Sequence, residues 1–261
     1  MIIKTPEQIE HIKDAMKIVS KAHRVVSEKI CEGMSTYQVE NIVKHVLKDA
    51  KAKSPFHRYK AGSRSPFPRW TCISVNEEVV HGIAQHNKIL RDGDIVTVDI
   101  GSVIERDGTS YYGDAAVTHM IGNVEEQTRE LVEQCRTVLY KAIEMTGPDV
   151  WLFDISKEMN KIAIEKGFGN VKGYYGHGVG LALHELPAIP AYVPEREEAM
   201  LNVKLQSGMI ITYEPILTLG SCETEELSDG WTVVTKDRSI AAHWEHSVLI
   251  TSEGFEVLTE Q

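Results

Sequence analysis

The segment Gly93-Asp94-Ile95-Val96-Thr97-Val98-Asp99 has a counterpart later in the chain, Gly208-Met209-Ile210-Ile211-Thr212-Tyr213-Glu214. In both copies a glycine precedes an apolar run, a threonine holds the same place and a carboxylate closes the run. A His-Gly pair stands ahead of each copy, His81-Gly82 in the first and His177-Gly178 in the second. Two matches in the same order indicate an internal duplication.

The segments around these copies predict alternating helices and strands. Residues 6 to about 31 keep helical apolar spacing, with Thr5 as the N-cap and Pro6 in the first turn. A second helix begins at Ser35 and ends before Pro55. After residue 122 the order restarts, with helices expected over about 125–145 and 154–166 and strands after them. The sequence therefore predicts an α+β fold with a mostly antiparallel sheet.

Composition narrows the classes of function. The 261 residues include 28 Lys and Arg against 38 Asp and Glu, a net charge of −10, which disfavours nucleic acid as a main partner. We expect neither a signal peptide nor a membrane span, because no apolar run is long enough. Four scattered cysteines without a Cys-x-x-Cys pair suit a reducing cytoplasm.

A hairpin is predicted to bring two carboxylates together. Strands are expected at 72–75, 95–100 and 111–120, the last two joined across Arg106-Asp107-Gly108-Thr109. A turn centred between Asp107 and Gly108 places Asp99 opposite residue 116, two residues from Asp114. The two carboxylates then share a face as diagonal neighbours, with Cα atoms about 7–8 Å apart. A slip of one residue in the register would reverse one face.

Both duplicated strands place a carboxylate among apolar residues. A strand aspartate ordinarily faces solvent, but Asp99 lies between Val98 and Ile100, where an unpaired charge is costly to bury. Glu214 repeats this anomaly after Tyr213. Carboxylates at duplicated positions therefore favour one shared site.

Three further residues are candidates for this site. Glycines on both sides of His177 allow the backbone to approach a bound group closely, although a lone histidine is more often an ordinary loop residue. His184 precedes Glu185-Leu186-Pro187, and Glu245 follows Trp244. None of the three is specific alone.

Taken together, four carboxylates and one imidazole would form a hard, oxygen-rich shell for two divalent ions, with Mn, Fe, Co or Zn all suitable. This set comprises Asp99, Asp114, His177, Glu214 and Glu245. It is too anionic for a single zinc ion, and without cations the carboxylates would raise one another's pKa values. Rival chemistries lack support, because the chain has no Gly-x-Ser-x-Gly elbow, no cysteine nucleophile motif and no dinucleotide fingerprint.

The chain resembles the type I methionine aminopeptidases over nearly its whole length. The matching segments, in family order, are Cys72–Ile83, Asp99 with Gly113-Asp114, Gly176–Gly180, Thr212–Pro215, Asp229–Thr232 and Glu245-His246. The resemblance implies a duplicated pita-bread fold, with pseudo-twofold halves and a central antiparallel sheet covered by two pairs of helices. It also implies a single catalytic domain, 1–261, with internal halves of about 6–122 and 123–251.

The same resemblance implies roles for individual residues. Asp99, Asp114, His177, Glu214 and Glu245 would bind two metal ions, with Asp114 and Glu245 bridging them, and Glu214 would act as general base and then acid. His81 and His184 would contact the substrate and the developing oxyanion. Phe67, Cys72 and Trp231 would line the pocket for the methionine side chain, with ordinary core packing as the alternative reading.

The activity implied by the resemblance is removal of the initiator methionine from nascent proteins whose second residue is small. Its partners would be N-terminal Met-X peptides of nascent chains and, transiently, the ribosome; we expect a cytoplasmic monomer that binds neither nucleic acid stably nor a membrane. Two departures concern the pocket rim: residues 64–70 lack a tyrosine common in this loop, and Leu183 replaces a common aromatic residue. An Xaa-Pro aminopeptidase or prolidase-like enzyme is the nearest alternative, followed by a non-catalytic pita-bread binding protein.

Overall fold

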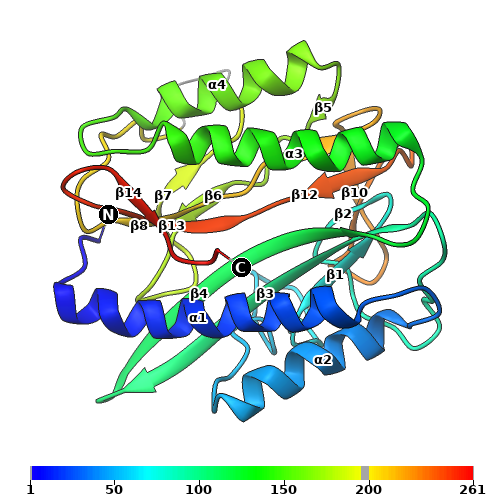
Figure 1. The fold of residues 1–261 in the computed structure, drawn as a ribbon, viewed down its shortest axis with the longest axis horizontal. Helices are drawn as coiled ribbons and strands as arrows, with labels where there is room; N and C mark the ends of the chain where they lie inside the picture. Colours follow the sequence, from blue (N-terminus) through cyan, green and yellow to red (C-terminus); the bar gives the residue numbers. More distant parts are fainter. Residues whose placement is uncertain (1, 195–199, 261) are drawn as a thin grey trace.

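The helices form two pairs that cover strands from the two parts of the chain (Figure 1). The computed structural model describes residues 2–194 and 200–260. The helices are α1 (Pro6–Lys29), α2 (Thr36–Asp49), α3 (Glu126–Glu144) and α4 (Leu152–Glu165). The strands are β1 (Cys72–Val75), β2 (Glu78–Val80), β3 (Ile95–Arg106), β4 (Thr109–Met120), β5 (Gly169–Asn170), β6 (Gly176–Gly178), β7 (Glu185–Ile189), β8 (Ile210–Tyr213), β9 (Ile216–Thr218), β10 (Thr224–Glu226), β11 (Val233–Thr235), β12 (Ala241–His243), β13 (His246–Ile250) and β14 (Phe255–Val257).

The first two helices begin where the sequence predicts. The side chains of Thr5 and Ser35 each accept a hydrogen bond from the backbone N–H three residues later, at Gln8 and Gln38. Each glutamine Oε1 in turn accepts a bond from the backbone N–H of the cap residue. The third helix also matches its expected range. The fourth begins at Leu152, two residues earlier than expected.

All strand pairs of the described residues are antiparallel, as the sequence predicts. The longest pair is the β3–β4 hairpin, whose turn residues Asp107 and Gly108 both have positive φ, as a two-residue type I′ turn requires. Its register places Asp99 opposite Ala116 and confirms the predicted pairing. Strand β3 extends past the expected end at residue 100, because Gly101 continues the ladder and packs against the Pro55 ring.

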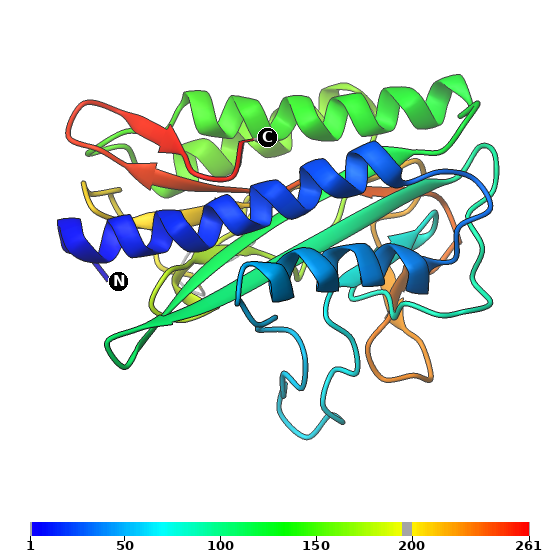
Figure 2. The same ribbon diagram turned by 60° about the horizontal axis from the view of Figure 1, so that its bottom comes forward.

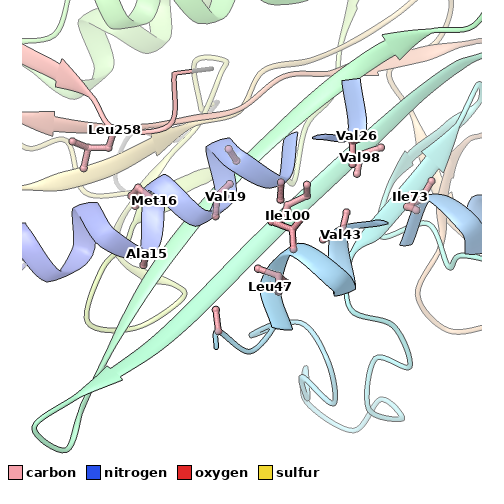
Figure 3. Packing of buried hydrophobic residues seen from close by; sticks show 14 of the residues in the cluster. Ala15, Met16, Val19, Val26, Val43, Leu47, Ile73, Val98, Ile100 and Leu258 are labelled. Carbon is pink, nitrogen blue, oxygen red and sulfur yellow. The ribbon is translucent and has the colours of Figure 1, made fainter. Parts of the chain in front are cut away.

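Two hydrophobic clusters lie beneath the helix pairs. In the first, Met16 and Val19 of α1 and Leu47 of α2 pack with Ile100 of β3 (Figure 3). The second cluster packs α3 and α4 against strands from the later part of the chain, including β8 and β13. Figure 2 shows α1 and α2 in front of the β3–β4 hairpin, while the loop after α2 and the β10–β11 hairpin extend at the bottom of the view, away from α3 and α4.

A helix that crosses a membrane needs about 20 predominantly apolar residues. In residues 2–194 and 200–260, no helix combines the length and the apolar character needed to cross a bilayer.

Candidate metal centre

The five side chains predicted to bind metal line one cavity of about 290 Å³. Asp99 comes from β3, Asp114 from β4 and His177 from β6, while Glu214 directly follows β8 and Glu245 directly precedes β13. The cavity therefore combines residues from both copies of the repeated segment and from the strands paired with them.

Asp114, His177 and Glu245 form the tightest group, with one ligand atom of each within 4.8 Å of the others. His177 Nε2 lies 3.9 Å from Asp114 Oδ2 and 3.7 Å from Glu214 Oε1. Its Nδ1 lies 2.9 Å from the Gly178 carbonyl oxygen, a contact that fixes the ring and leaves Nε2 facing the carboxylates.

A backbone bridge between β4 and the segment before β13 positions the carboxylates. Ala116 and Glu245 exchange N–H···O bonds of 3.3 and 2.8 Å, so β4 meets the segment that precedes β13. The Ser247 hydroxyl donates to the Asp114 carbonyl oxygen at 2.7 Å and adds a second link. Because both connections involve the backbone at or beside a site residue, the carboxylates sit on rigid elements.

The electrostatics of the cavity match a site built for cations. Burial raises the pKa of Asp99 to about 7, although a side-chain hydrogen bond with Cys72 lowers it. Burial, followed by repulsion from neighbouring carboxylates, raises the pKa values of Asp114, Glu214 and Glu245 well above their usual range. The sequence predicted this mutual effect.

Unpartnered oxygens give an independent test of whether a metal would fit. Asp99 Oδ1, Asp114 Oδ1 and Glu245 Oε1 are buried without a hydrogen-bond partner among the described residues. Burial lowers the pKa of His177 to about 3, which keeps its imidazole neutral and able to act as a ligand. Four carboxylates and a neutral imidazole suit divalent cations with a preference for oxygen and nitrogen donors.

The glycines beside His177 are required by the packing of β6 against its neighbours. A Cβ at Gly176 would lie 2.3 Å from the Thr212 carbonyl oxygen, and one at Gly178 would lie 2.7 Å from that of Leu186. The expected close approach to a bound group stays a prediction, and these backbone contacts give a second reason for the glycines. They allow β6 to fit between the backbones of its neighbours.

The expected substrate-pocket residues form an apolar wall of the same cavity. Phe67, Cys72 and Trp231 are buried in one cluster together with Leu183. The Phe67 and Trp231 rings meet edge to face at 5.2 Å, and the Trp231 indole N–H donates to the Ser65 carbonyl oxygen at 2.9 Å. The wall thus joins the loop after α2 to the segment before β11.

His81 and His184 also line the cavity. His81 has φ +58°, an uncommon conformation for a residue other than glycine, and a Cβ at the following Gly82 would lie 2.1 Å from the Ile73 carbonyl oxygen. The His184 ring packs edge to face on that of His177 at 4.5 Å. Its Nδ1 lies 3.0 Å from the Tyr59 hydroxyl oxygen.

Sequence reasoning missed several residues that line the cavity. Tyr59 supplies an aromatic hydroxyl from the loop in which residues 64–70 lack one, and Tyr174 lies beside His81. Arg64 forms an ion pair with Glu226 and places its guanidinium 5.4 Å from the Trp231 ring centroid. The one feature of the sequence that could have indicated Tyr59 and Arg64 is their place in the loop after α2, which contains residues 64–70.

Comparisons with known proteins agree over almost the entire chain. The model of metallopeptidase family M24 matches residues 10–252. The methionine aminopeptidase of Aquifex aeolicus is 39% identical over 254 residues, 97% of this chain and 96% of the relative. Methionine aminopeptidase 1 of Bacillus subtilis is 36% identical over 259 residues, 99% of each. The crystal structure of methionine aminopeptidase from Thermotoga maritima superposes with a TM-score of 0.90 at 41% identity and covers 100% of both chains.

Proposed function

The chain belongs to metallopeptidase family M24, and from that membership we propose that it is a methionine aminopeptidase that removes the initiator methionine from nascent proteins with a small second residue. One observation carries the proposal: a single cavity joins four carboxylates and a neutral imidazole to an apolar, aromatic wall. The carboxylates and the imidazole suit metal-assisted hydrolysis, and the aromatic wall suits a thioether side chain.

We propose that Asp99, Asp114, His177, Glu214 and Glu245 would hold two divalent ions. Cobalt, manganese, iron and zinc all suit these donors. When bound, such ions lower the pKa of an attacking water and polarise the scissile carbonyl. The unpartnered buried oxygens of Asp99, Asp114 and Glu245 support this assignment.

Glu214 is the proposed proton carrier. Its carboxylate accepts a hydrogen bond from the Thr212 hydroxyl at 3.3 Å, and burial raises its pKa well above the usual range. A carboxylate with a raised pKa accepts a proton more readily at neutral pH, so Glu214 can take a proton from the attacking water and return it to the leaving amine.

His184 and His81 are proposed to bind the substrate and the developing oxyanion. When the Tyr59 hydroxyl donates to His184 Nδ1, the neutral ring carries its proton on Nε2, which becomes the donor available to the substrate. Burial lowers the pKa of His81 to about 4, so it too binds as a neutral imidazole. Preorganised donors of this kind stabilise charge that forms in the transition state.

The methionine side chain is proposed to lie against Phe67, Cys72 and Trp231. Burial, with added repulsion from Asp99, raises the pKa of the Cys72 thiol well above its usual range. The thiol therefore stays protonated and serves as a small wall residue, not as a nucleophile.

The proposed cellular setting rests on the composition of the chain. Four free cysteines and a net charge of −10 fit a cytoplasmic monomer that acts on N-terminal Met-X peptides, transiently at the ribosome, and binds neither nucleic acid stably nor a membrane.

Peptide kinetics on metal-loaded protein test the proposal. Met-Ala-Ser, Met-Gly-Ser and Met-Ser-Ser should exceed Met-Ile-Ser and Met-Lys-Ser in kcat/KM by at least about 10²-fold, because a bulky second residue misplaces the scissile bond. Leu-Ala-Ser and Ala-Pro substrates should be cleaved poorly. The Asp114→Asn variant, which lacks a proposed metal ligand, should be inactive and serves as the control for contaminating peptidases. Equal rates for Met-Ala-Ser and Met-Lys-Ser, or a preference for Xaa-Pro, would reject the proposal.

A further inference from the structure

A second cavity, of about 520 Å³, lies on the side of the sheets that faces the helices. It is bounded by β4 residues 117–120, by α3 between Val132 and Tyr140, by Trp244 and His246, and at its edge by Ser27 of α1. Figure 1 shows its surroundings, with α1 and α3 on either side of β13 and the C-terminal end between them. The methionine aminopeptidase reaction proposed above uses none of these residues.

This cavity lies directly behind the proposed metal centre. Glu245 lines the first cavity, whereas its neighbours Trp244 and His246 line the second. On β4, Asp114 lines the first cavity and His119 the second. Side chains of an extended chain alternate between its two faces, so the same two segments present ligands to the first cavity and nitrogen-bearing rings to the second.

Two nitrogen atoms of the second cavity have no partner. His119 Nε2 and Trp244 Nε1 are buried, and neither has a hydrogen-bond partner among residues 2–194 and 200–260. An indole nitrogen can only donate, so Trp244 needs an acceptor. A buried donor left unpaired costs its full desolvation free energy, which a bound acceptor would recover.

Arg136 supplies a positive charge beside these nitrogens. Its guanidinium lies 5.3 Å from the Tyr140 ring centroid and 5.5 Å from that of Trp244. Although Glu133 and Glu260 also border the cavity, Arg136 has no ion pair within the described part of the chain. A guanidinium stacked on aromatic rings keeps its planar N–H fork free for a carboxylate.

The rim and the walls narrow the class of ligand. The carboxylates of Glu133 and Glu260 would repel a dianion such as phosphate more strongly than a single negative charge. The walls include apolar side chains, Val117, Met120 and Val132 among them, which suit an apolar body.

We propose that this cavity is a second ligand site, which binds a small monocarboxylate with an apolar body. The carboxylate would accept hydrogen bonds from Arg136, Trp244 Nε1 and His119 Nε2, and the body would lie against the apolar walls.

Nuclear magnetic resonance of zinc-loaded protein with ¹⁵N-labelled tryptophan tests the site. The chain has 4 tryptophans, so Trp244→Phe identifies the Trp244 indole signal by its disappearance. Benzoate should shift this signal saturably, while benzyl alcohol, its neutral counterpart, and inorganic phosphate should not. Arg136→Gln should weaken benzoate binding at least about 10-fold, whereas Arg129→Gln, an exposed α3 arginine outside the cavity, should leave it unchanged.

The alternatives give different results in the same titration. Trp231→Phe identifies the Trp231 signal in the same way, and a shift of that signal alone would place benzoate at the metal centre and overturn the proposal. An unmoved Trp244 signal, or an equal response to benzyl alcohol or phosphate, would also overturn it. Equal affinities of Arg136→Gln and Arg129→Gln would remove the arginine from the site and reject the carboxylate assignment.

Discussion

Single hydrogen bonds orient the groups that surround the proposed reaction centre. The Tyr59 hydroxyl is hydrogen-bonded to Nδ1 of His184, and the Gly178 carbonyl oxygen is hydrogen-bonded to Nδ1 of His177. In each ring Nε2 therefore remains available to groups in the cavity. Imidazole chemistry depends on which nitrogen carries the proton, so these contacts decide what each histidine can do.

Replacing His184 should separate catalysis from metal binding. We expect His184→Ala to lower kcat by about 10²–10³-fold with unchanged metal content, because one donor to the oxyanion is lost. Tyr59→Phe should lower kcat less, since the ring remains. The control is His45→Ala on the exposed face of α2, which should behave like the unmodified protein. Loss of a metal ion from His184→Ala would show that His184 is a ligand.

Asp99 should make the metal-free protein less stable as the pH rises. Its pKa is about 7 in the folded protein against an ordinary value of 3.8, so the folded state binds more protons between these two values. Stability from this group is complete below pH 3.8 and is lost as the pH rises through 7. Buried histidines with lowered pKa values act in the opposite direction, so a matched variant is needed.

That variant is Asp99→Asn, which removes the titrating group. In chelator-treated samples, the Tm of Asp99→Asn relative to the unmodified protein should increase between about pH 5 and pH 8 by at least about 2 °C. Thermal denaturation in a series of buffers measures this difference. A difference that is constant across the series, or that decreases, would contradict the assignment of a raised pKa to Asp99.

At the scale of elements, the segment before α1 anchors the loop that carries His184. Lys4 Nζ lies 2.7 Å from Glu185 Oε2, with 1% and 2% of the two side chains exposed. Glu185 Oε1 also accepts backbone N–H bonds from Leu181 and Ala182 at 2.7 and 3.2 Å. The N-terminal segment therefore stabilises the loop that carries His184.

Breaking this pair should destabilise both the fold and the loop. Lys4→Met leaves Glu185 buried without a cation and should lower the free energy of unfolding by about 3 kcal/mol. Adding Glu185→Gln should recover part of the loss, and Lys17→Met, in an exposed pair with Asp14, should cost less than about 0.5 kcal/mol. Urea denaturation with peptide kinetics measures both effects. Equal losses for Lys4→Met and Lys17→Met would refute a structural role for the buried pair.

At the scale of the whole molecule, the proposed metal centre joins the two parts of the chain. Asp99 and Asp114 come from the β3–β4 hairpin beneath α1 and α2, whereas Glu214 and Glu245 flank β8 and β13 beneath α3 and α4. Four carboxylates repel one another across this junction. Cations placed between them would stabilise the assembled molecule as well as its activity.

Metal removal should therefore have two effects. Exhaustive EDTA treatment should abolish turnover and lower the Tm, and manganese, iron or cobalt should restore both. Asp114→Asn should retain less metal, whereas Asp14→Asn on the exposed face of α1 should retain the normal amount. Full activity in protein shown to be metal-free by elemental analysis would contradict the requirement for a divalent metal.

The sequence by itself determined the features that depend on near neighbours. The N-cap Thr5 located the start of α1, the apolar pattern from Ser35 located that of α2, and the turn at Asp107-Gly108 placed Asp99 opposite Ala116. The repeated segment and the family resemblance then indicated the fold and the ligand set. The division into halves of about 6–122 and 123–251 stays a prediction.

The tertiary structure alone decided the features that depend on contacts between distant segments. It brought Tyr59 to His184 and Arg64 to Trp231, it continued β3 past Gly101, and it opened the cavity beside Arg136. Periodicity and turn chemistry act over a few residues, so they carry no information about such partners. Packing of the two parts of the chain against each other sets which distant side chains meet, and that required the folded molecule.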